Sequence, residues 1–355
     1  MTELYTNVIL NSFQNPNEEF YKLEFPTQQN EGHRNFSVTP FTLNNERYKR
    51  IKKMPNLKDI KSRIQSVQNT QKITKAMKMV AAAKVKKAES SVKSSRPFTE
   101  ELLVMFKRML ATVGELKSEG EVFERALDNY PELLQKREVK TEGLVVVTSN
   151  KGLAGAYNAN IVRETLKKIE ENSAKGIATK LYVIGQKGVS ALQHKDNVVI
   201  CKKYISIMDN PTSAGAIVIA EDIAHDFVEG IIDKIEVITT RFNNMMSYSV
   251  QKWQVLPVKI DYDKKADKLE ALMEFMPSGR AILQKIVPMF ITNSIYQAIL
   301  EAGASELASR MTAMSAASNN AEEMINTLTV AYNKARQGAI TQELIEIVSG
   351  ASAQN

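Results

Sequence analysis

The residues best placed for chemistry form a glycine-containing turn directly after an apolar run. Residues 144–149 read Leu-Val-Val-Val-Thr-Ser, and Lys151, Gly152 and Gly155 follow them. Glycines after a strand can bring backbone N–H groups and a helix N-terminus to an anion. Their spacing here matches neither the phosphate-loop pattern nor the dinucleotide-binding pattern. Two interpretations therefore stay open: a structural tight turn, which the spacing favours, and a phosphate or nucleotide site.

No other group of residues has the spacing of a catalytic or metal site. The sequence contains no Gly-x-Ser-x-Gly elbow and no His-Glu-x-x-His pair. The histidines, His33, His194 and His225, are scattered along the chain. The single cysteine, Cys201, excludes a disulfide framework and a cysteine-based zinc site, and its apolar neighbours predict a buried thiol on a strand. We therefore expect no catalytic residue, no metal and no cofactor.

The positive charge of the chain is concentrated in one segment. The net charge is +7, and residues 51–96 hold 13 basic residues against Asp59 and Glu89, which gives this segment a net charge of +11. A nucleic-acid-binding protein would use such charges to neutralise phosphates, but the segment has no aromatic residues for base stacking. A helix that presents its lysines to an acidic protein partner, or to solvent, explains the pattern better. We therefore expect no nucleic acid partner.

The length of 355 residues suggests two or three structural units, and a hydrophobic content of 43% is enough to form a core. No run of 18 apolar residues is present, so we expect no membrane-spanning helix. Residues 1–53 are rich in Asn and Gln and show no clear periodicity, which predicts a disordered extension. A protein start at Met54 and a divergent targeting segment stay open as alternatives, although mitochondrial transit peptides contain few acidic residues and this segment contains several.

Two long helical patterns enclose the middle of the chain. In the first, apolar residues recur at helical spacing and no Gly or Pro interrupts them before Pro97. Residues 54–113 are therefore predicted to form an N-terminal coiled-coil helix, either broken or continuous at Pro97, and residues 114–142 a connecting region. The second pattern predicts a C-terminal coiled-coil helix within residues 266–355, and we expect Gly350 to end it.

The C-terminal pattern is rich in small residues, among them Ala302, Gly303, Ala304 and Ala308. Small side chains let two helix backbones approach closely. Residues 289–349 would extend over about 90 Å as a helix, too far to be buried in a domain of this size. We therefore expect the two terminal helices to pair in an antiparallel coiled coil.

The segment between the helices, residues 143–265, alternates apolar runs with helical patterns. This alternation predicts a Rossmann-like α/β domain, in which a parallel sheet is layered with helices, and Pro257 places the last strand at an edge. The expected strands are 144–149, 180–185, 197–204 and 234–242, with one or two more in 246–258, and the expected helices are 158–171, 186–193 and 213–230.

Three stretches of the sequence resemble the gamma subunit of F-type ATP synthases. Residues 66–89 (SVQNTQKITKAMKMVAAAKVKKAE) resemble the N-terminal helix of that family, and residues 305–351 resemble its C-terminal helix. Residues 145–161 (VVVTSNKGLAGAYNANI) are similar to its strand-turn-helix segment. The resemblance runs from about Met54 to Ala353 and leaves the N-terminal extension outside.

The resemblance implies a rotor subunit that is not itself catalytic. In this family the terminal helices form a central shaft inside the ring of alpha and beta subunits, and the α/β domain contacts the epsilon subunit and the membrane c-ring. Ion flow turns the c-ring and the shaft, and this rotation drives the conformational cycle of the catalytic sites that make ATP. The residues that match contact positions with the alpha/beta ring, or form the apolar end of the shaft, are Met77, Lys78, Arg310, Arg336, Gln337, Thr341, Leu344 and Ile347.

The resemblance also implies a location and a mode of regulation. Residues 54–57 resemble a bacterial start, so we expect a peripheral protein at the cytoplasmic face of a bacterial plasma membrane, with the matrix side of the mitochondrial inner membrane as the alternative. Chloroplast members carry an inserted segment with a regulatory cysteine pair, but only Cys201 lies near the corresponding region, so we expect no thiol regulation. The lysines expected to meet acidic loops of the surrounding ring are Lys72, Lys75, Lys84, Lys86 and Lys87.

Overall fold

A computed structural model of the chain describes residues 56–115, 132–134, 137–195, 198–258 and 279–352. The predicted N-terminal extension and most of the predicted connecting region lie outside these residues. The described part consists of two long helices and a five-stranded sheet with shorter helices. The predicted fold class, an α/β domain with a long antiparallel helix pair, is confirmed.

Helix α3 (Leu57–Glu115) is one continuous helix of 59 residues that contains Pro97. A proline removes one backbone hydrogen bond and crowds the preceding turn, so it usually breaks or bends a helix. Here Pro97 is exposed, while Val92 and Leu102 on either side of it are buried against other elements. Packing on both sides therefore holds the helix together across the proline.

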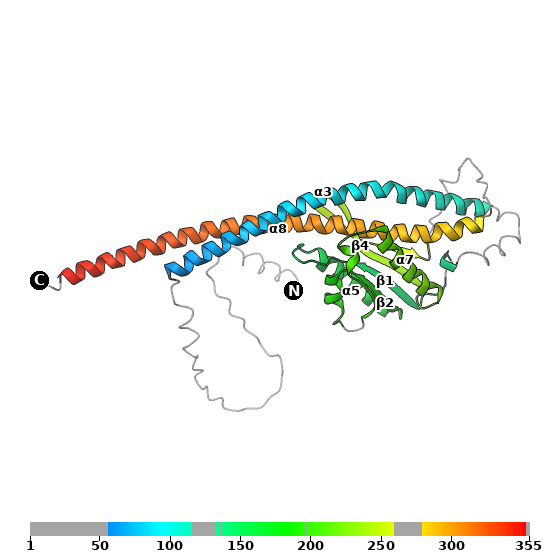
Figure 1. Ribbon diagram of the computed structural model, residues 1–355. Helices are drawn as coiled ribbons and strands as arrows, with labels where there is room; N and C mark the ends of the chain where they lie inside the picture. Colours follow the sequence, from blue (N-terminus) through cyan, green and yellow to red (C-terminus); the bar gives the residue numbers. More distant parts are fainter. Residues whose placement is uncertain (1–55, 116–131, 135–136, 196–197, 259–278, 353–355) are drawn as a thin grey trace, which may run out of the picture. The chain divides into compact units, whose positions relative to one another are not determined.

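Helix α8 (Gly279–Ser352) contains 74 residues and lies alongside α3 in the opposite direction (Figure 1). The contacts between the two helices fix this orientation. Thr99 of α3 accepts a hydrogen bond from Asn293, and Arg96, one turn earlier in α3, pairs with Glu301, two turns later in α8. As residue numbers fall along one helix they rise along the other, as in an antiparallel coiled coil. We call α3 and α8 together the helix pair.

The sheet has the strand order β3-β2-β1-β4-β5. Strands β1 to β4 are parallel, and β5 joins β4 in antiparallel orientation at one edge. The strands are β1 (Thr141–Val147), β2 (Ala178–Ile184), β3 (Val199–Tyr204), β4 (Lys234–Asn244) and β5 (Ser247–Leu256). The continuous apolar run of β1 is explained by its central position, because a central strand of a parallel sheet is buried on both faces.

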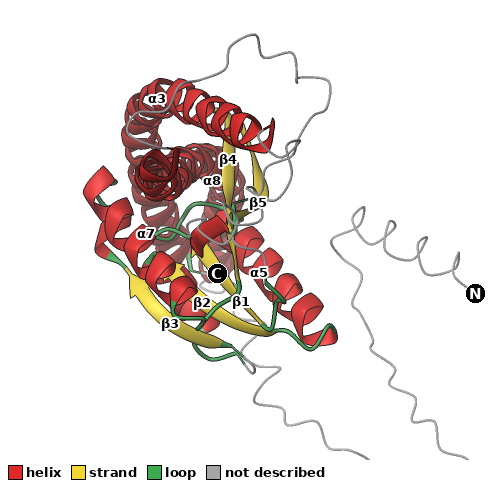
Figure 2. Cartoon of the chain, turned by 90° about the vertical axis from the view of Figure 1, so that its right-hand side faces the viewer, coloured by secondary structure: helices red, strands yellow, loops and turns green. Residues whose placement is uncertain are grey.

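Helices cover both faces of the sheet (Figure 2). Helices α5 (Tyr157–Ala174) and α6 (Gln186–Leu192) pack on one face, and α7 (Ser213–Val228) packs with α8 on the other. Helix α8 therefore has two roles, because its first half completes the core of the α/β domain and also pairs with α3. The sheet and the helix pair are parts of one packed body.

Three details of the sequence-based prediction are wrong. Cys201 lies on β3 as predicted, but it is exposed, because β3 is an edge strand on which alternate residues face outward. Gly350 lies inside α8, which ends at Ser352, because a glycine costs only about 1 kcal/mol within a helix. Strand β1 (Thr141–Val147) begins three residues before the predicted strand 144–149 and ends two residues before the end of that predicted strand.

Among the described residues, none of the helices is long and apolar enough to cross a membrane.

Candidate functional site

The C-terminal end of α8 is a free helix with apolar side chains on its surface. Every residue from Thr341 to Ser352 is exposed, and this end of α8 extends beyond the start of α3 (Figure 1). Ile340, Leu344, Ile347 and Val348 share one helix face and are 50–68% exposed. Exposed apolar surface of this kind normally marks a site of contact with another molecule. The free end is therefore a candidate binding surface.

The other predicted contact residues are distributed over both helices. Arg336 and Gln337 are exposed on α8, one turn before the apolar face, and the hydroxyl of Thr341 donates a hydrogen bond to the carbonyl oxygen of Gln337 at 2.9 Å. Met77 is half-buried and Lys78 is exposed on α3. The structure thus brings the C-terminal residues together on one stretch of helix and separates them from the pair on α3.

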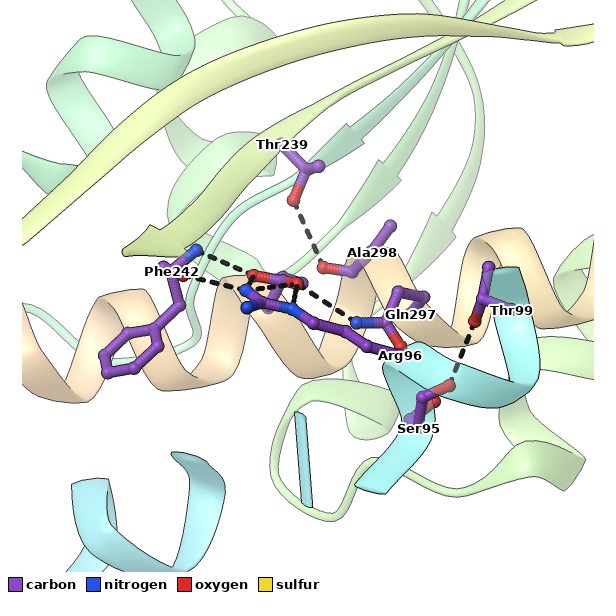
Figure 3. Close-up of polar contacts among 8 residues, drawn as sticks. Ser95, Arg96, Thr99, Thr239, Phe242, Gln297 and Ala298 are labelled. Atoms are coloured by element: carbon purple, nitrogen blue, oxygen red, sulfur yellow. Dashed lines mark hydrogen bonds and ion pairs between the residues drawn. The ribbon is translucent and has the colours of Figure 1, made fainter. Parts of the chain in front are cut away.

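An ion pair between half-buried Arg96 and a buried carboxylate joins the helix pair to the sheet (Figure 3). Arg96 of α3 donates two hydrogen bonds to the carboxylate of Glu301 in α8, at 2.8 and 3.0 Å, and one to the carbonyl oxygen of Phe242 in β4, at 2.8 Å. The carboxylate of Glu301 also accepts hydrogen bonds from the backbone N–H of Phe242 at 2.7 Å and from Gln297 at 3.0 Å. Three elements therefore meet at one pair of charges.

The carboxylate of this ion pair is shielded from solvent, whereas the Arg96 side chain is 29% exposed. Glu301 is only 5% exposed, and hydrogen bonding to it raises the pKa of the Arg96 guanidinium above its ordinary value. The Phe242 ring packs in a cluster with Val85, Val92 and Leu300, which surrounds the same junction with apolar side chains. Removing Arg96 would leave the buried carboxylate of Glu301 without its ion-pair partner, which destabilises a fold because the charge has lost its solvation.

A second junction connects α8 to the glycine-containing turn after β1. Ser309 donates a hydrogen bond to the carbonyl oxygen of Ala154 at 2.7 Å, and Arg310 donates one to that of Gly152 at 3.2 Å. The turn contains two residues with positive φ, Leu153 at 63° and Gly155 at 54°. Two of its carbonyl oxygens are thus bound by α8, which supports the interpretation as a structural tight turn.

Arg310 is held by an ion pair within the chain. It forms an ion pair with Glu306, one turn earlier in α8, and both side chains are largely buried. Burial raises the pKa of the Glu306 carboxyl to about 6, and the positive charges of Arg310, Lys151 and Lys84 offset only part of this effect. The second junction therefore contains a carboxyl group that titrates in a mildly acidic range.

The basic segment of α3 lies on the surface, and part of it borders a cavity. The five lysines expected to meet acidic loops are all exposed. Lys84 and Lys87 line a cavity of about 400 Å³ next to the second junction, together with Lys151 of the turn and Asp209. Among the described residues, no group of His, Cys, Asp and Glu side chains could hold a metal ion.

The sequence-based reasoning missed the acidic residues at both junctions. In the sequence, Arg96 is one of many basic residues and is not distinguished from the others. The predicted contact residues do not include Glu301 or Glu306. A signal was present, because these two glutamates interrupt the small and apolar residues on the face of α8 that was predicted to be buried. A charged residue on a predicted helix interface indicates a buried partner.

Comparisons with known proteins agree with this architecture. The family model described as ATP synthase matches residues 56–354. The ATP synthase gamma chain of the cyanobacterium Picosynechococcus sp. is 40% identical over 325 residues, which cover 84% of this chain and 100% of the relative, and that of Nostoc punctiforme is 38% identical. A chain in the structure of the central stalk and c-ring of the Tetrahymena thermophila mitochondrial ATP synthase is 27% identical, with a TM-score of 0.50 over 69% of this chain and 99% of the other. A Euglena gracilis ATP synthase chain, 17% identical, shares the fold with a TM-score of 0.56 over 84% of this chain. The chain belongs to the ATP synthase gamma-chain family.

Proposed function

We propose that this chain is the central-stalk subunit of an F-type ATP synthase and couples rotation of an ion-driven c-ring to the catalytic cycle of an alpha/beta ring. One observation carries the proposal: in a member of the gamma-chain family, a long antiparallel helix pair is joined to an α/β domain and ends in a free, apolar helix. In this role the chain forms no bond in ATP itself. It transmits torque to subunits that do.

The helix pair has the properties that a torque-transmitting shaft requires. Ala304 and Ala308 are buried between the helices, where small side chains allow close approach of the two backbones and a stiff pair. The free end can turn inside an apolar sleeve, because Leu344 and Ile347 offer dispersion contacts without directional bonds. The residues proposed to contact the alpha/beta ring are Met77, Lys78, Arg310, Arg336, Gln337, Thr341, Leu344 and Ile347.

Electrostatics favour acidic partners for the outer face of α3. Lysines on one exposed helix surface attract acidic loops, and this attraction acts over a Debye length of about 8 Å at physiological ionic strength. The cavity beside Lys84 and Lys87 would receive such a loop close to the second junction. These contacts are at the surface, so each contributes only about 0–1 kcal/mol and can be broken and remade during rotation.

The further partners are proposed by analogy with the family. The Tetrahymena structure comprises a central stalk and a c-ring, and we propose that the α/β domain of this chain likewise contacts a c-ring, together with an epsilon subunit. The chain would then be a peripheral protein of a membrane-associated complex. We place it at the cytoplasmic face of a bacterial plasma membrane, with the matrix side of the mitochondrial inner membrane as the alternative.

Reconstitution tests the proposal directly. The chain should co-purify with alpha and beta subunits and restore ATP synthesis to a complex that lacks its gamma subunit. A chain that purifies alone and restores no synthesis would contradict the proposed function. The matched control is the alpha/beta ring without any gamma subunit, which should show no coupled synthesis.

A further inference from the structure

Torque must pass between the α/β domain and the helix pair, and the Arg96–Glu301 pair lies where both helices meet the sheet. Among the polar contacts of the described residues, these are the side chains that together bind α3, α8 and β4. Other contacts join two of these elements at a time. The hydroxyl of Thr239 in β4 donates to the carbonyl oxygen of Ala298 in α8 at 3.2 Å, for example.

Apolar packing alone is poorly suited to resist sliding. The hydrophobic effect is non-directional, so it opposes separation of two surfaces more strongly than a shift of one along the other. A bidentate arginine–carboxylate pair has a fixed planar geometry and is among the strongest hydrogen-bonded arrangements in proteins. Movement of one element by a few tenths of a helix turn would lengthen several of these bonds at once.

The attachment to β4 is through its backbone, which makes it independent of side-chain rotation. The N–H of Phe242 is bound by Glu301 and its C=O by Arg96, so both charged side chains bind the same residue of β4. The Phe242 ring, 2% exposed, is enclosed by residues of both helices, including Val92 and Leu300. A displacement of the helix pair would therefore have to carry β4 with it.

We propose that Arg96 and Glu301 are positioning residues that keep the helix pair and the α/β domain in a single register under torque. The inference rests on the proposed function. The Arg96–Glu301 pair would then transmit load in addition to its contribution to folding. Weakening the pair should cause slip, meaning ATP hydrolysis without the matching proton transfer. Slip should appear when the rotor works against a proton gradient and disappear when the gradient is removed.

The test uses the assembled, membrane-bound complex with three variants of this chain. Glu301→Gln keeps the shape but removes the charge, and Arg96→Lys keeps the charge but removes the bidentate geometry. Lys93→Gln is the matched control, because exposed Lys93 lies one turn before Arg96 and its ion pair, with half-buried Glu89, lies within α3. For each complex we would measure the amount assembled, ATP hydrolysis with an uncoupler, and protons pumped per ATP hydrolysed against a gradient.

We expect both pair variants to assemble and to hydrolyse ATP at the control rate when uncoupled. Under load, slip should increase by roughly ten- to a hundredfold, the range that corresponds to losing one hydrogen bond to a charged group. A normal pumping ratio in an assembled variant of either residue would overturn the proposal. If both variants fail to assemble while Lys93→Gln assembles, the pair serves folding alone and the proposal is also rejected. Failure of the unaltered chain to assemble would instead refute the proposed function.

Discussion

Glu306 makes a prediction about stability that can be tested on the full-length chain alone. The residue is 7% exposed and pairs with Arg310, yet burial raises the pKa of its carboxyl from 4.5 to about 6. A raised pKa means that the folded state favours the neutral acid. The ion pair at this position is therefore too weak to compensate for the loss of solvation, and replacing Glu306 with Gln should remove a penalty that depends on pH.

The sign and size of the effect follow from proton linkage. Below about pH 4.5 the Glu306 carboxyl is protonated in both the folded and the unfolded state, so the stability that the folded state gains from a neutral carboxyl is fully present. Between about pH 4.5 and 6 the unfolded chain loses the proton first, so the free energy of unfolding falls as the pH rises. The difference between a pKa of 4.5 and one of about 6 corresponds to about 2 kcal/mol. The Glu306→Gln variant has no carboxyl at this position, so its free energy of unfolding should not fall by this amount.

The assay is urea unfolding, followed by circular dichroism, of the unaltered chain and the variant at a series of pH values from 4 to about 8. From pH 4.5 to 7 the variant should gain about 2 kcal/mol in stability relative to the unaltered chain. Glu322→Gln, at an exposed position of the same helix, is the control for replacing a glutamate of α8 by glutamine. If the difference for Glu306→Gln were constant, or if the unaltered chain gained with rising pH, the ion pair with Arg310 would outweigh burial and the reasoning would be refuted.

Three further substitutions test other parts of the structure. Gly185→Ala should destabilise the chain by about 3 kcal/mol or more in urea unfolding, because the backbone has a φ of 96° and an added Cβ would lie 2.2 Å from the carbonyl oxygen of Thr148. Gly303→Ala should instead stabilise it by about 1 kcal/mol, because the position is helical and, among the described residues, no atom outside the neighbouring helix backbone lies within 4 Å of the added Cβ; a loss of stability would contradict this packing. Met77→Lys should lower the ratio of proton pumping to ATP hydrolysis without a matching loss of assembled complex, because it places a second cation beside Lys78 at the proposed contact with the beta subunits. A normal ratio in that variant would argue against the contact.

Much of the fold could be predicted from the sequence because its periodicities are long and regular. Continuous apolar runs identify buried parallel strands, and the helical patterns at both ends are too long for a domain core, which leaves pairing as the way to bury their apolar faces. The single cysteine shows the limit of this reasoning. Apolar neighbours predicted burial of Cys201, but exposure depends on whether its strand is central or at an edge, and strand order is set by contacts between distant segments.

The junctions between the helix pair and the sheet depend even more on distant contacts. Periodicity shows which face of a helix is buried, but it does not give the register of one helix against another, and Arg96 and Glu301 are 205 positions apart. Arg96 is one of many basic residues in its segment, and Glu301 lies among small residues of α8. That these two side chains pair can be recognised only when the register of the two helices is known. Glu301 nevertheless carries information in the sequence, because an unpaired carboxylate on a buried helix face would cost several kcal/mol. The interface of the helix pair consists mostly of small and apolar residues, so its few charged residues are the positions where directional bonds can fix the register. These charged residues are therefore the first candidates for the residues that carry load.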